Sequence, residues 1–320
     1  MKRAFMFIIV LLMLSGSLPA AEPPVPTLVP VPITKKRSAA LLRKIDQSRL
    51  KLAPLHRKLG KPRYGEWRWV HQEPGQSFAQ YLGINPVPEK GQRRTIYLQP
   101  LGALNTEQHR IFEITAEFIG IYFNTPVKIL QPLPLTRIPE EAQRVHPVSR
   151  SHQILTEYIM KTLLQPRLPA DAAACLAVTN RDIWPGRGRD FVFGAASLHD
   201  RVGVCSLNRN GDPTKDPAAF RRCLLRTIKT ASHEMAHIYS IYHCTAFRCN
   251  MCGSMSREES DTRPVFACPE CQAKFCWIGA IAPLERYRRL AAFFKKYNLE
   301  KQRGFAECSV KALSAKNISK

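Results

Sequence analysis

Apolar residues along the chain follow two periodicities, and their alternation predicts a layered α/β domain. Between residues 107 and 123, apolar side chains recur every three or four positions, as in a helix with one buried face. Short apolar runs bounded by polar or turn residues predict strands instead. The strands are expected at residues 95–99, 127–130, 174–178, 191–195 and 202–207, and the helices at 107–123, 151–164 and from about 218 to near 240. Strands that alternate with helices indicate an α/β fold rather than an all-β fold.

The first residues have the anatomy of a secretory signal peptide. Lys2 and Arg3 precede an apolar run over residues 4–14, and small residues follow as far as Ala20. As a helix this run would be about 17 Å long, whereas the hydrocarbon core of a bilayer is roughly 30 Å thick. We therefore expect a signal peptide at residues 1–20 and a secreted or periplasmic protein with no membrane span after cleavage. Leu18 stands where a small residue is usual, so an N-terminal membrane anchor is the alternative.

Basic residues dominate the composition, and many of them lie in an N-terminal extension at residues 21–92. The chain has 48 Lys and Arg against 25 Asp and Glu, a net charge of +23, which favours acidic partners or surfaces. Residues 22–34 are rich in proline and predict an extended spacer. We interpret residues 35–63 as a basic helix lying on the domain, with binding to anionic lipid or polysaccharide as the alternative. No aromatic residue is interleaved with these charges, which argues against nucleic-acid binding.

The last of the predicted helices carries the motif His233-Glu234-Met235-Ala236-His237. Two histidines four residues apart lie on one face of a helix, so both imidazoles can reach one zinc ion. Glu234 lies beside them, where its carboxylate can point at a water on the metal. His243 can become a third ligand only if the helix ends near residue 240 and the chain turns back. We expect Ser240, the smallest residue between the last two histidines, to adopt the left-handed or other non-helical conformation that this turn needs.

Five cysteines crowd into the segment that follows. Cys244 and Cys249 form one close pair and Cys268 and Cys271 another, and four thiolates in two pairs are typical of a closed, structural zinc site. Disulfide bonds are the alternative, because a signal peptide indicates an oxidising compartment. Cys252 is a fifth candidate that could substitute for Cys249.

The remaining histidines and cysteines carry no metal-ligand spacing. His71 and the other isolated histidines are interpreted as surface or core residues, and His199 as a loop residue after a strand. Cys175 and Cys205 lie in apolar strands and are interpreted as small core residues.

Together these motifs resemble the archaemetzincins, a family of zinc metallopeptidases. The resemblance rests on His233-Glu234-Met235-Ala236-His237-Ile238-Tyr239-Ser240-Ile241-Tyr242-His243-Cys244, on Cys249-Asn250-Met251 and on Cys268-Pro269-Glu270-Cys271, and it extends to residues 182–185 and 191–198. It implies that His233, His237 and His243 bind a catalytic zinc, with Glu234 as the general base and acid acting on zinc-bound water. It also implies that Cys244, Cys249, Cys268 and Cys271 bind a structural zinc, which makes two Zn²⁺ ions per chain.

The resemblance further implies a fold and a substrate class. The fold would be α/β, a metzincin-like mixed sheet with an active-site helix and a C-terminal subdomain held by the four-cysteine zinc. This catalytic domain would span residues 93–305 and precede a basic tail at 306–320. A peptide or protein substrate would add as a strand to residues 191–197, and Met251 would form a turn beneath the metal. Ser240 replaces the usual glycine, which, with the charge of +23, motivates an alternative: a zinc-stabilised, catalytically inactive binding protein for acidic ligands.

Overall fold

The computed structural model describes residues 38–84 and 93–315. The predicted signal peptide and the proline-rich spacer lie outside the described residues. Within the described part, no helix combines the length and the apolar character that a membrane span requires.

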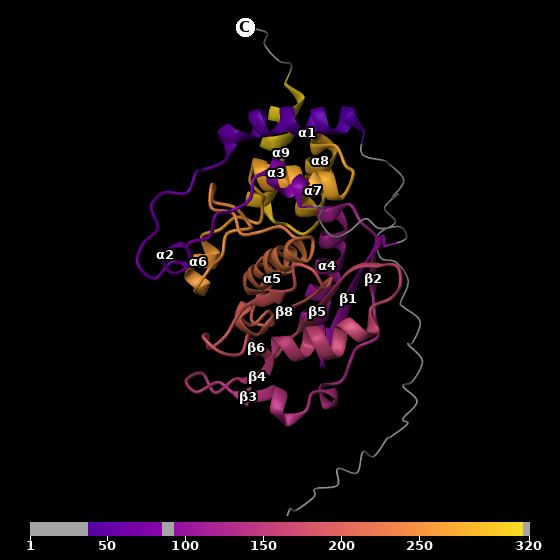
Figure 1. The fold of residues 1–320 in the computed structure, drawn as a ribbon, viewed down its shortest axis with the longest axis vertical. Helices are drawn as coiled ribbons and strands as arrows, with labels where there is room; N and C mark the ends of the chain where they lie inside the picture. Colours follow the sequence, from indigo (N-terminus) through magenta and orange to yellow (C-terminus); the bar gives the residue numbers. More distant parts are fainter. Residues whose placement is uncertain (1–37, 85–92, 316–320) are drawn as a thin grey trace, which may run out of the picture.

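A five-stranded mixed sheet forms the centre of the molecule (Figure 1). Its strand order is β2-β1-β5-β8-β7, with β7 antiparallel to β8 and the other neighbouring pairs parallel. The strands are β1 (Thr95–Leu101), β2 (Val127–Ile129), β5 (Ala172–Thr179), β7 (Gly194–Ala196) and β8 (Val202–Ser206). The sequence predicted all five, but β7 begins at Gly194 rather than at residue 191. The backbone of Val192 instead forms an isolated bridge to Ile183.

Alternate side chains of the central strands enter two separate cores. Ile96 and Leu98 of β1 pack with helices α4 (Thr106–Phe123) and α5 (Pro217–Ile238), while Tyr97 packs on the opposite side. Both helices were predicted. Asn105 and Gln108 form a capping box that fixes the start of α4, and Asp216 caps α5 just before Pro217. The mixed sheet, covered by helices, confirms the predicted α/β class.

A second, three-stranded sheet corrects the predicted helix at residues 151–164. Its order is β3-β4-β6, made of β3 (Gln143–Val145), β4 (His152–Leu155) and β6 (Asp182–Trp184). Only the second half of the predicted helix is helical, as the π-helical segment η4 (Tyr158–Leu164). Gln153 explains the difference, because its buried side chain bonds to Asp182 at 2.8 Å and to Arg144 at 2.7 Å. Asp182 is 29 residues from Gln153 in the sequence, so the local pattern could not indicate this partner.

Four further helices complete the C-terminal part: α6 (Arg257–Asp261), α7 (Pro269–Ile278), α8 (Pro283–Lys296) and α9 (Glu300–Ser314). The expected boundary at residue 305 falls within α9. Ala306 and Ser309 are buried in this helix, so at least residues 306–314 of the predicted tail belong to the folded body.

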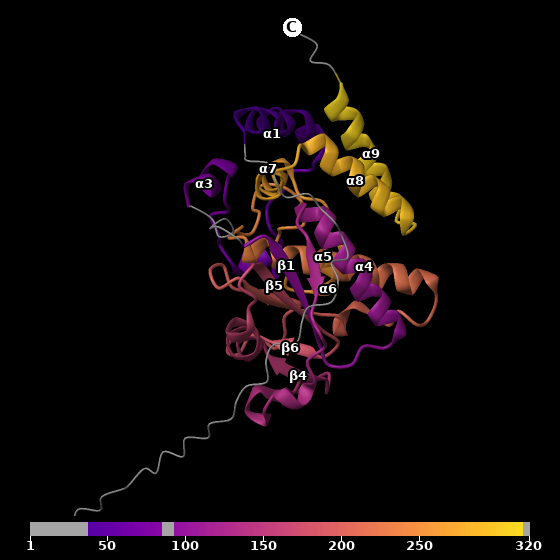
Figure 2. The ribbon, with the colours of Figure 1, turned by 90° about the vertical axis from the view of Figure 1, so that its right-hand side faces the viewer.

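The folded body also begins earlier than residue 93. The N-terminal helices are α1 (Ala39–Leu52), α2 (Trp67–Val70) and α3 (Phe78–Gly83). Helix α1 lies on the domain, as predicted, beside the C-terminal helices (Figure 2). It is shorter than the helix expected over residues 35–63, because it ends at Leu52, just before Pro54. Ile45 and Leu52 are buried in the core that it shares with these helices. Arg49 of α1 pairs with Glu270, inside the cysteine segment. Short 3₁₀ turns complete the described structure: η1 (Ala53–Leu55), η2 (Leu135–Arg137), η3 (Glu140–Ala142), η5 (Gln165–Arg167) and η6 (Asn208–Asn210).

Candidate active site

The turn after helix α5 has the geometry that the sequence required. Ser240 has a φ of 62°, in the left-handed region, which confirms the predicted conformation. Its amide donates to the carbonyl of His237 at 2.8 Å, and the amide of Ile241 donates to Ala236 at 3.0 Å. These two bonds form a Schellman motif, which ends the helix and reverses the chain. The Ser240 hydroxyl also donates to the carbonyl of Leu198 at 2.8 Å, so the turn is tied to the loop after β7.

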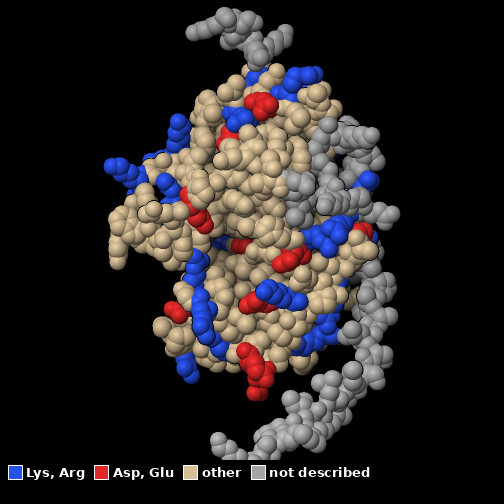
Figure 3. Space-filling view, viewed as in Figure 1, with Lys and Arg blue, Asp and Glu red and all other residues tan. Residues whose placement is uncertain are grey.

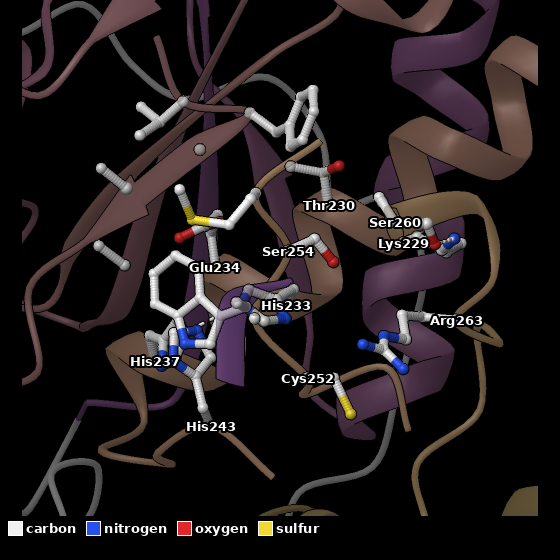
Figure 4. Close-up of a pocket in the computed structure, with 18 of the residues that line it drawn as sticks. Lys229, Thr230, His233, Glu234, His237, His243, Cys252, Ser254, Ser260 and Arg263 are labelled. Atoms are coloured by element: carbon white, nitrogen blue, oxygen red, sulfur yellow. Dashed lines mark hydrogen bonds between the residues drawn. The ribbon is translucent and has the colours of Figure 1, made fainter. Parts of the chain in front are cut away.

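This reversal brings three imidazoles together at one point (Figure 4). Nε2 of His237 lies 3.0 Å from Nε2 of His233 and 3.2 Å from Nε2 of His243. Ligand nitrogens around a tetrahedral zinc, each about 2.0 Å from the metal, are about 3.3 Å apart. The observed spacings fit that requirement.

Hydrogen bonds on the opposite side of each ring fix the orientation of the imidazoles. Nδ1 of His233 lies 2.7 Å from the Asn250 carbonyl, and Nδ1 of His237 lies 2.7 Å from the Ile241 carbonyl. A carbonyl can only accept, so each Nδ1 carries the proton and each Nε2 presents a lone pair. Burial lowers the pKa of His233 to about 3 and that of His237 well below its usual range, which keeps both rings neutral. Neutral imidazoles are the form that binds metal.

Glu73 is the hydrogen-bond partner of Nδ1 of His243, and no motif in the sequence indicated it. Both carboxylate oxygens of Glu73 lie 2.9 Å from Nδ1 of His243. The indole nitrogen of Trp67 donates to the same carboxylate at 2.9 Å. The Trp67 ring packs edge to face against His243, with ring centroids 4.8 Å apart. His71 stacks on Trp67, with ring centroids 4.2 Å apart. The N-terminal extension therefore contributes directly to the site, although no spacing relates these residues to the histidine motif.

Glu234 projects from the same helix toward strand β7. Its side chain packs against Gly194, where an added Cβ would lie only 2.4 Å from Cγ of Glu234. Glycine at this position therefore leaves the space that the carboxylate occupies. Glu234 is 6% exposed, and burial raises the pKa of its carboxyl group to about 8. A nearby metal cation would oppose this shift by stabilising the carboxylate.

The four predicted cysteines form a second cluster directly after the third histidine. Cys244, Cys249, Cys268 and Cys271 are buried, and their sulfur atoms lie within 4.8 Å of one another. All ten cysteines are free thiols in the structure, so it contains none of the alternative disulfides. Sγ of Cys249 accepts from the amide of Cys268 at 3.2 Å, as a thiolate ligand would. Hydrogen bonds from the neighbouring thiols hold the pKa of Cys244 well below its usual range.

Other residues singled out in the sequence lie around these clusters. Cys252 is outside the four-sulfur group, and its thiol donates to the Phe247 carbonyl at 3.1 Å. Met251 is buried in the turn that follows Asn250, and its carbonyl accepts from the amide of Cys244 at 2.7 Å. Cys175 and Cys205 are buried core residues, as predicted.

A cleft of about 560 Å³ runs past the imidazoles and Glu234. Its walls are formed by residues 188–196, by one face of helix α5 and by residues 252–255, and Trp67 closes part of it. The ring of Trp67 lies directly over Gly253, where a Cβ would come within 2.4 Å of the indole. Strand β7, at the end of the central sheet, lines the cleft along its length.

Comparison with known proteins identifies this arrangement. A family model described as Peptidase family M54 matches residues 128–276. Archaemetzincin-2 of Macaca fascicularis is 32% identical over 260 residues, which cover 70% of this chain and 71% of that protein. The archaemetzincin of Thermococcus kodakarensis is 29% identical over 189 residues, covering 57% and 95%. A crystal structure of archaemetzincin from Archaeoglobus fulgidus, complexed with malonate, is 29% identical, with a TM-score of 0.45, and covers 56% of this chain and 99% of that one.

These similarities also decide between the two functions that the sequence left open. The inactive binding protein was motivated partly by Ser240, but Ser240 adopts the conformation that the active-site turn needs. The family model that matches this chain describes a peptidase family, and archaemetzincin-2 is 32% identical over 71% of its own length. The chain belongs to the archaemetzincin family, peptidase family M54, and is a zinc-dependent peptidase.

Proposed function

We propose that this peptidase binds two zinc ions per chain, one catalytic and one structural. His233, His237 and His243 are the proposed ligands of the catalytic ion, because their Nε2 atoms converge while their Nδ1 atoms face hydrogen-bond acceptors. This convergence is the observation that carries the proposal. The proposed structural ion is held by Cys244, Cys249, Cys268 and Cys271, a closed thiolate set with no position left for water.

When bound, the catalytic zinc supplies a Lewis acid that polarises the scissile carbonyl and acidifies water. The side chains of the protein transfer the proton. Glu234 lies one residue after the first ligand and faces the cleft, so its carboxylate can accept a proton from the attacking water. The same group then donates that proton to the leaving amine. Gly194 supports this role, since it leaves room for the carboxylate against β7.

We propose that Glu73 and Trp67 position the third ligand. The carboxylate of Glu73 holds the Nδ1 proton of His243, and Trp67 holds both the carboxylate and the ring. A carboxylate bonded to a metal-ligating histidine fixes the tautomer and increases the basicity of the ligand nitrogen. Glu73 is thus a positioning residue rather than a catalytic one.

The proposed substrate is a peptide or protein that lies along strand β7. This strand ends the sheet and lines the cleft, so its outer edge is where an extended peptide can pair by main-chain hydrogen bonds. Its residues, Gly194 to Ala196, are small and leave the edge accessible to another backbone.

We also propose that the protein is exported by the signal peptide at residues 1–20. The basic start, the apolar run and the small residues near Ala20 support this interpretation. Mass analysis of the mature protein from its host should find a new N-terminus near Ala21. Retention of residues 1–20 in a membrane fraction would support the alternative of an N-terminal anchor.

The central experiment combines metal content with hydrolysis. Purified protein should contain two zinc ions per chain and cleave members of a mixed peptide library with free and blocked N-termini. Glu234→Gln should retain both ions and lose at least about 100-fold in rate, the usual scale for a positioned proton-transfer group. Near-normal cleavage by the metal-replete variant would remove Glu234 from the mechanism, and a protein that binds zinc only at the cysteines would refute the three-histidine site.

A further inference from the structure

Lys229 is a buried cation in the substrate cleft that the proposed mechanism does not use. It lies four residues before His233, so it occupies the same face of helix α5 about 6 Å away along the axis. The residue is 7% exposed and lines the same cleft as the three imidazoles. Figure 4 shows the imidazoles on one side of this cleft and Lys229, Ser260 and Arg263 together on the other.

The protein does not neutralise Lys229 with a carboxylate in the part of the chain that the structure describes. Its ammonium donates to the carbonyl of Ser260 at 2.6 Å, which uses one of three N–H groups. Asp261 is the acid whose charge favours the protonated amine, but Arg226 already pairs with it, with Nε 3.0 Å from Oδ1. Arg226 therefore already neutralises the Asp261 carboxylate that would otherwise balance Lys229.

Arg263 adds a second positive charge to the same end of the cleft. Its Nη2 lies 2.8 Å from Glu259, but that carboxylate also accepts from the amides of Trp67 and Met255. Nε of Arg263 is buried and has no hydrogen-bond partner within residues 38–84 and 93–315. Arg257 is close by, with its guanidinium 3.8 Å from the ring of Phe193, another residue of the cleft wall. Positive charges thus outnumber the available carboxylates.

A buried cation is costly when it has no carboxylate partner, as for Lys229, or shares one with other donors, as Arg263 shares Glu259, which points to an anion that arrives with the substrate. Building on the proposed peptidase function, we propose that Lys229 and Arg263 form a subsite for a carboxylate of the peptide substrate. An acidic side chain close to the scissile bond and the C-terminal carboxylate of a short peptide share this chemistry. On the face drawn in Figure 3, Lys and Arg are spread out with Asp and Glu between them rather than gathered in one patch.

The charge state of Lys229 suits this role near neutral pH. Burial lowers its pKa to about 8, with Arg226, Arg257 and Arg263 acting in the same direction and Asp261 opposing them. A lysine with a lowered pKa is charged below that value and neutral above it. The amine is therefore mostly protonated at pH 7, and a bound carboxylate would stabilise it further.

Matched peptides test the subsite directly. One series places Glu, Gln or Lys on either side of the cleaved bond, and a second compares free with amidated C-termini. We expect kcat/KM for the preferred acidic peptide to exceed that of its neutral counterpart by about tenfold or more, as for a charge-assisted hydrogen bond. The first series identifies a side-chain carboxylate, whereas the second identifies the C-terminus. Equal kcat/KM for acidic and neutral peptides in both series would overturn the proposal.

Variants assign the effect to Lys229. Lys229→Met should remove the preference by lowering kcat/KM for the acidic peptide about tenfold, with the neutral peptide changed less than about twofold. Lys229→Arg should keep the preference, and Lys301→Met, at an exposed lysine of α9, serves as the matched control. A preference that persists in Lys229→Met would overturn the assignment. If Lys229→Met fails to fold, the pH dependence of the wild-type protein gives the same test. The preference for the acidic peptide should fall as the pH rises past about 8, and a preference that stays constant from pH 6 to 10 would overturn the assignment to Lys229.

Failure of the subsite and failure of the peptidase function give different results. Zinc-dependent cleavage without any carboxylate preference overturns the subsite alone. Absence of cleavage for every peptide overturns the proposed chemistry, and equilibrium binding of the fluorescently labelled Glu and Gln peptides then tests the subsite without turnover.

Discussion

Glu73 and His243 are 170 residues apart, yet both carboxylate oxygens of Glu73 lie 2.9 Å from Nδ1 of His243. The contact joins the N-terminal extension to the third imidazole of the histidine cluster. Lys274 and Gln76 strengthen the same connection, because the lysine ammonium lies 2.9 Å from the side-chain oxygen of Gln76, three residues after Glu73. The extension is therefore a structural part of the active-site wall.

Replacing Glu73 should weaken zinc binding at the histidine site. Glu73→Ala removes the acceptor that orients His243, and we expect zinc affinity to fall by about 10-fold to 100-fold. Glu73→Gln keeps an acceptor oxygen without the charge and should lie between wild type and Ala. Titration with a competing chelator measures this affinity, with Glu66→Gln in the same segment as the control, since its carboxylate accepts only the Arg63 amide among the hydrogen bonds of the described residues. Unchanged affinity in Glu73→Ala would show that the extension does not support the metal.

Gly194→Ala should displace Glu234 while leaving the metal ligands in place. The new Cβ would lie 2.4 Å from Cγ and 2.6 Å from Cδ of Glu234, so the carboxylate must move. A displacement of about 1 Å can reduce the rate roughly 100-fold. We expect kcat to fall by at least about tenfold with the zinc content unchanged.

A matched glycine separates this clash from a general effect of the substitution. Gly304 lies within helix α9, and no heavy atom would come within 4 Å of an added Cβ. Gly304→Ala should keep full activity and be neutral or slightly stabilising, since alanine favours helix. Full activity in Gly194→Ala would show that the Glu234 carboxylate can act from another position and that its contact with Gly194 is not required for catalysis.

Two substitutions at Ser240 separate its backbone strain from its hydrogen bond. Ser240→Gly relieves a left-handed φ of 62° but loses the bond to the Leu198 carbonyl, and each effect amounts to about 1 kcal/mol. The free energy of unfolding should therefore change by less than about 1 kcal/mol, with zinc binding preserved. Ser240→Ala keeps the strain and loses the bond, so it should destabilise by about 1 kcal/mol. Denaturant unfolding of the zinc-loaded proteins measures both, and a Gly variant less stable than the Ala variant would contradict the strain argument.

The histidine and cysteine clusters were predictable because their chemistry is local in the sequence. His233 and His237 share a helix face, and the need for a third ligand implied the turn that Ser240 makes. The central strands were also predictable from local sequence. Neighbouring side chains such as Ile96 and Tyr97 enter cores on opposite faces of the sheet, so both faces are buried and the strand is a short apolar run.

Long-range partners explain what the sequence did not predict. Gln153 is polar but buried, because it bonds to Asp182 from another strand, and this placed a strand where the pattern predicted a helix. Glu73 and Trp67 reach the site only through tertiary packing, so no spacing identified them. Lys229 was visible as a charge on helix α5, but its burial and its hydrogen bond to the Ser260 carbonyl appear only in the folded chain.

Loss of one cysteine ligand should affect both clusters. In Cys268→Ser the thiolate set is incomplete, and metal affinity at such a site is also folding energy, so we expect at most one zinc per chain and a lower melting temperature. The effect should reach the histidines, because Cys244 follows His243 directly and its amide bonds to Met251, next to the Asn250 carbonyl that orients His233. Catalytic activity should therefore fall although no catalytic residue has changed.

Two other cysteines provide controls for this experiment. Cys252→Ser should retain two zinc ions, because its sulfur lies outside the four-sulfur group, and Cys308→Ser should be neutral, because this cysteine is exposed on α9. Zinc content by elemental analysis and free-thiol counts by mass spectrometry distinguish the possibilities. If active protein carries Cys244, Cys249, Cys268 and Cys271 as disulfides, the cysteine cluster is a covalent cross-link and not a metal site. If Cys252→Ser loses a zinc ion while Cys249→Ser keeps it, Cys252 is the fourth ligand in solution.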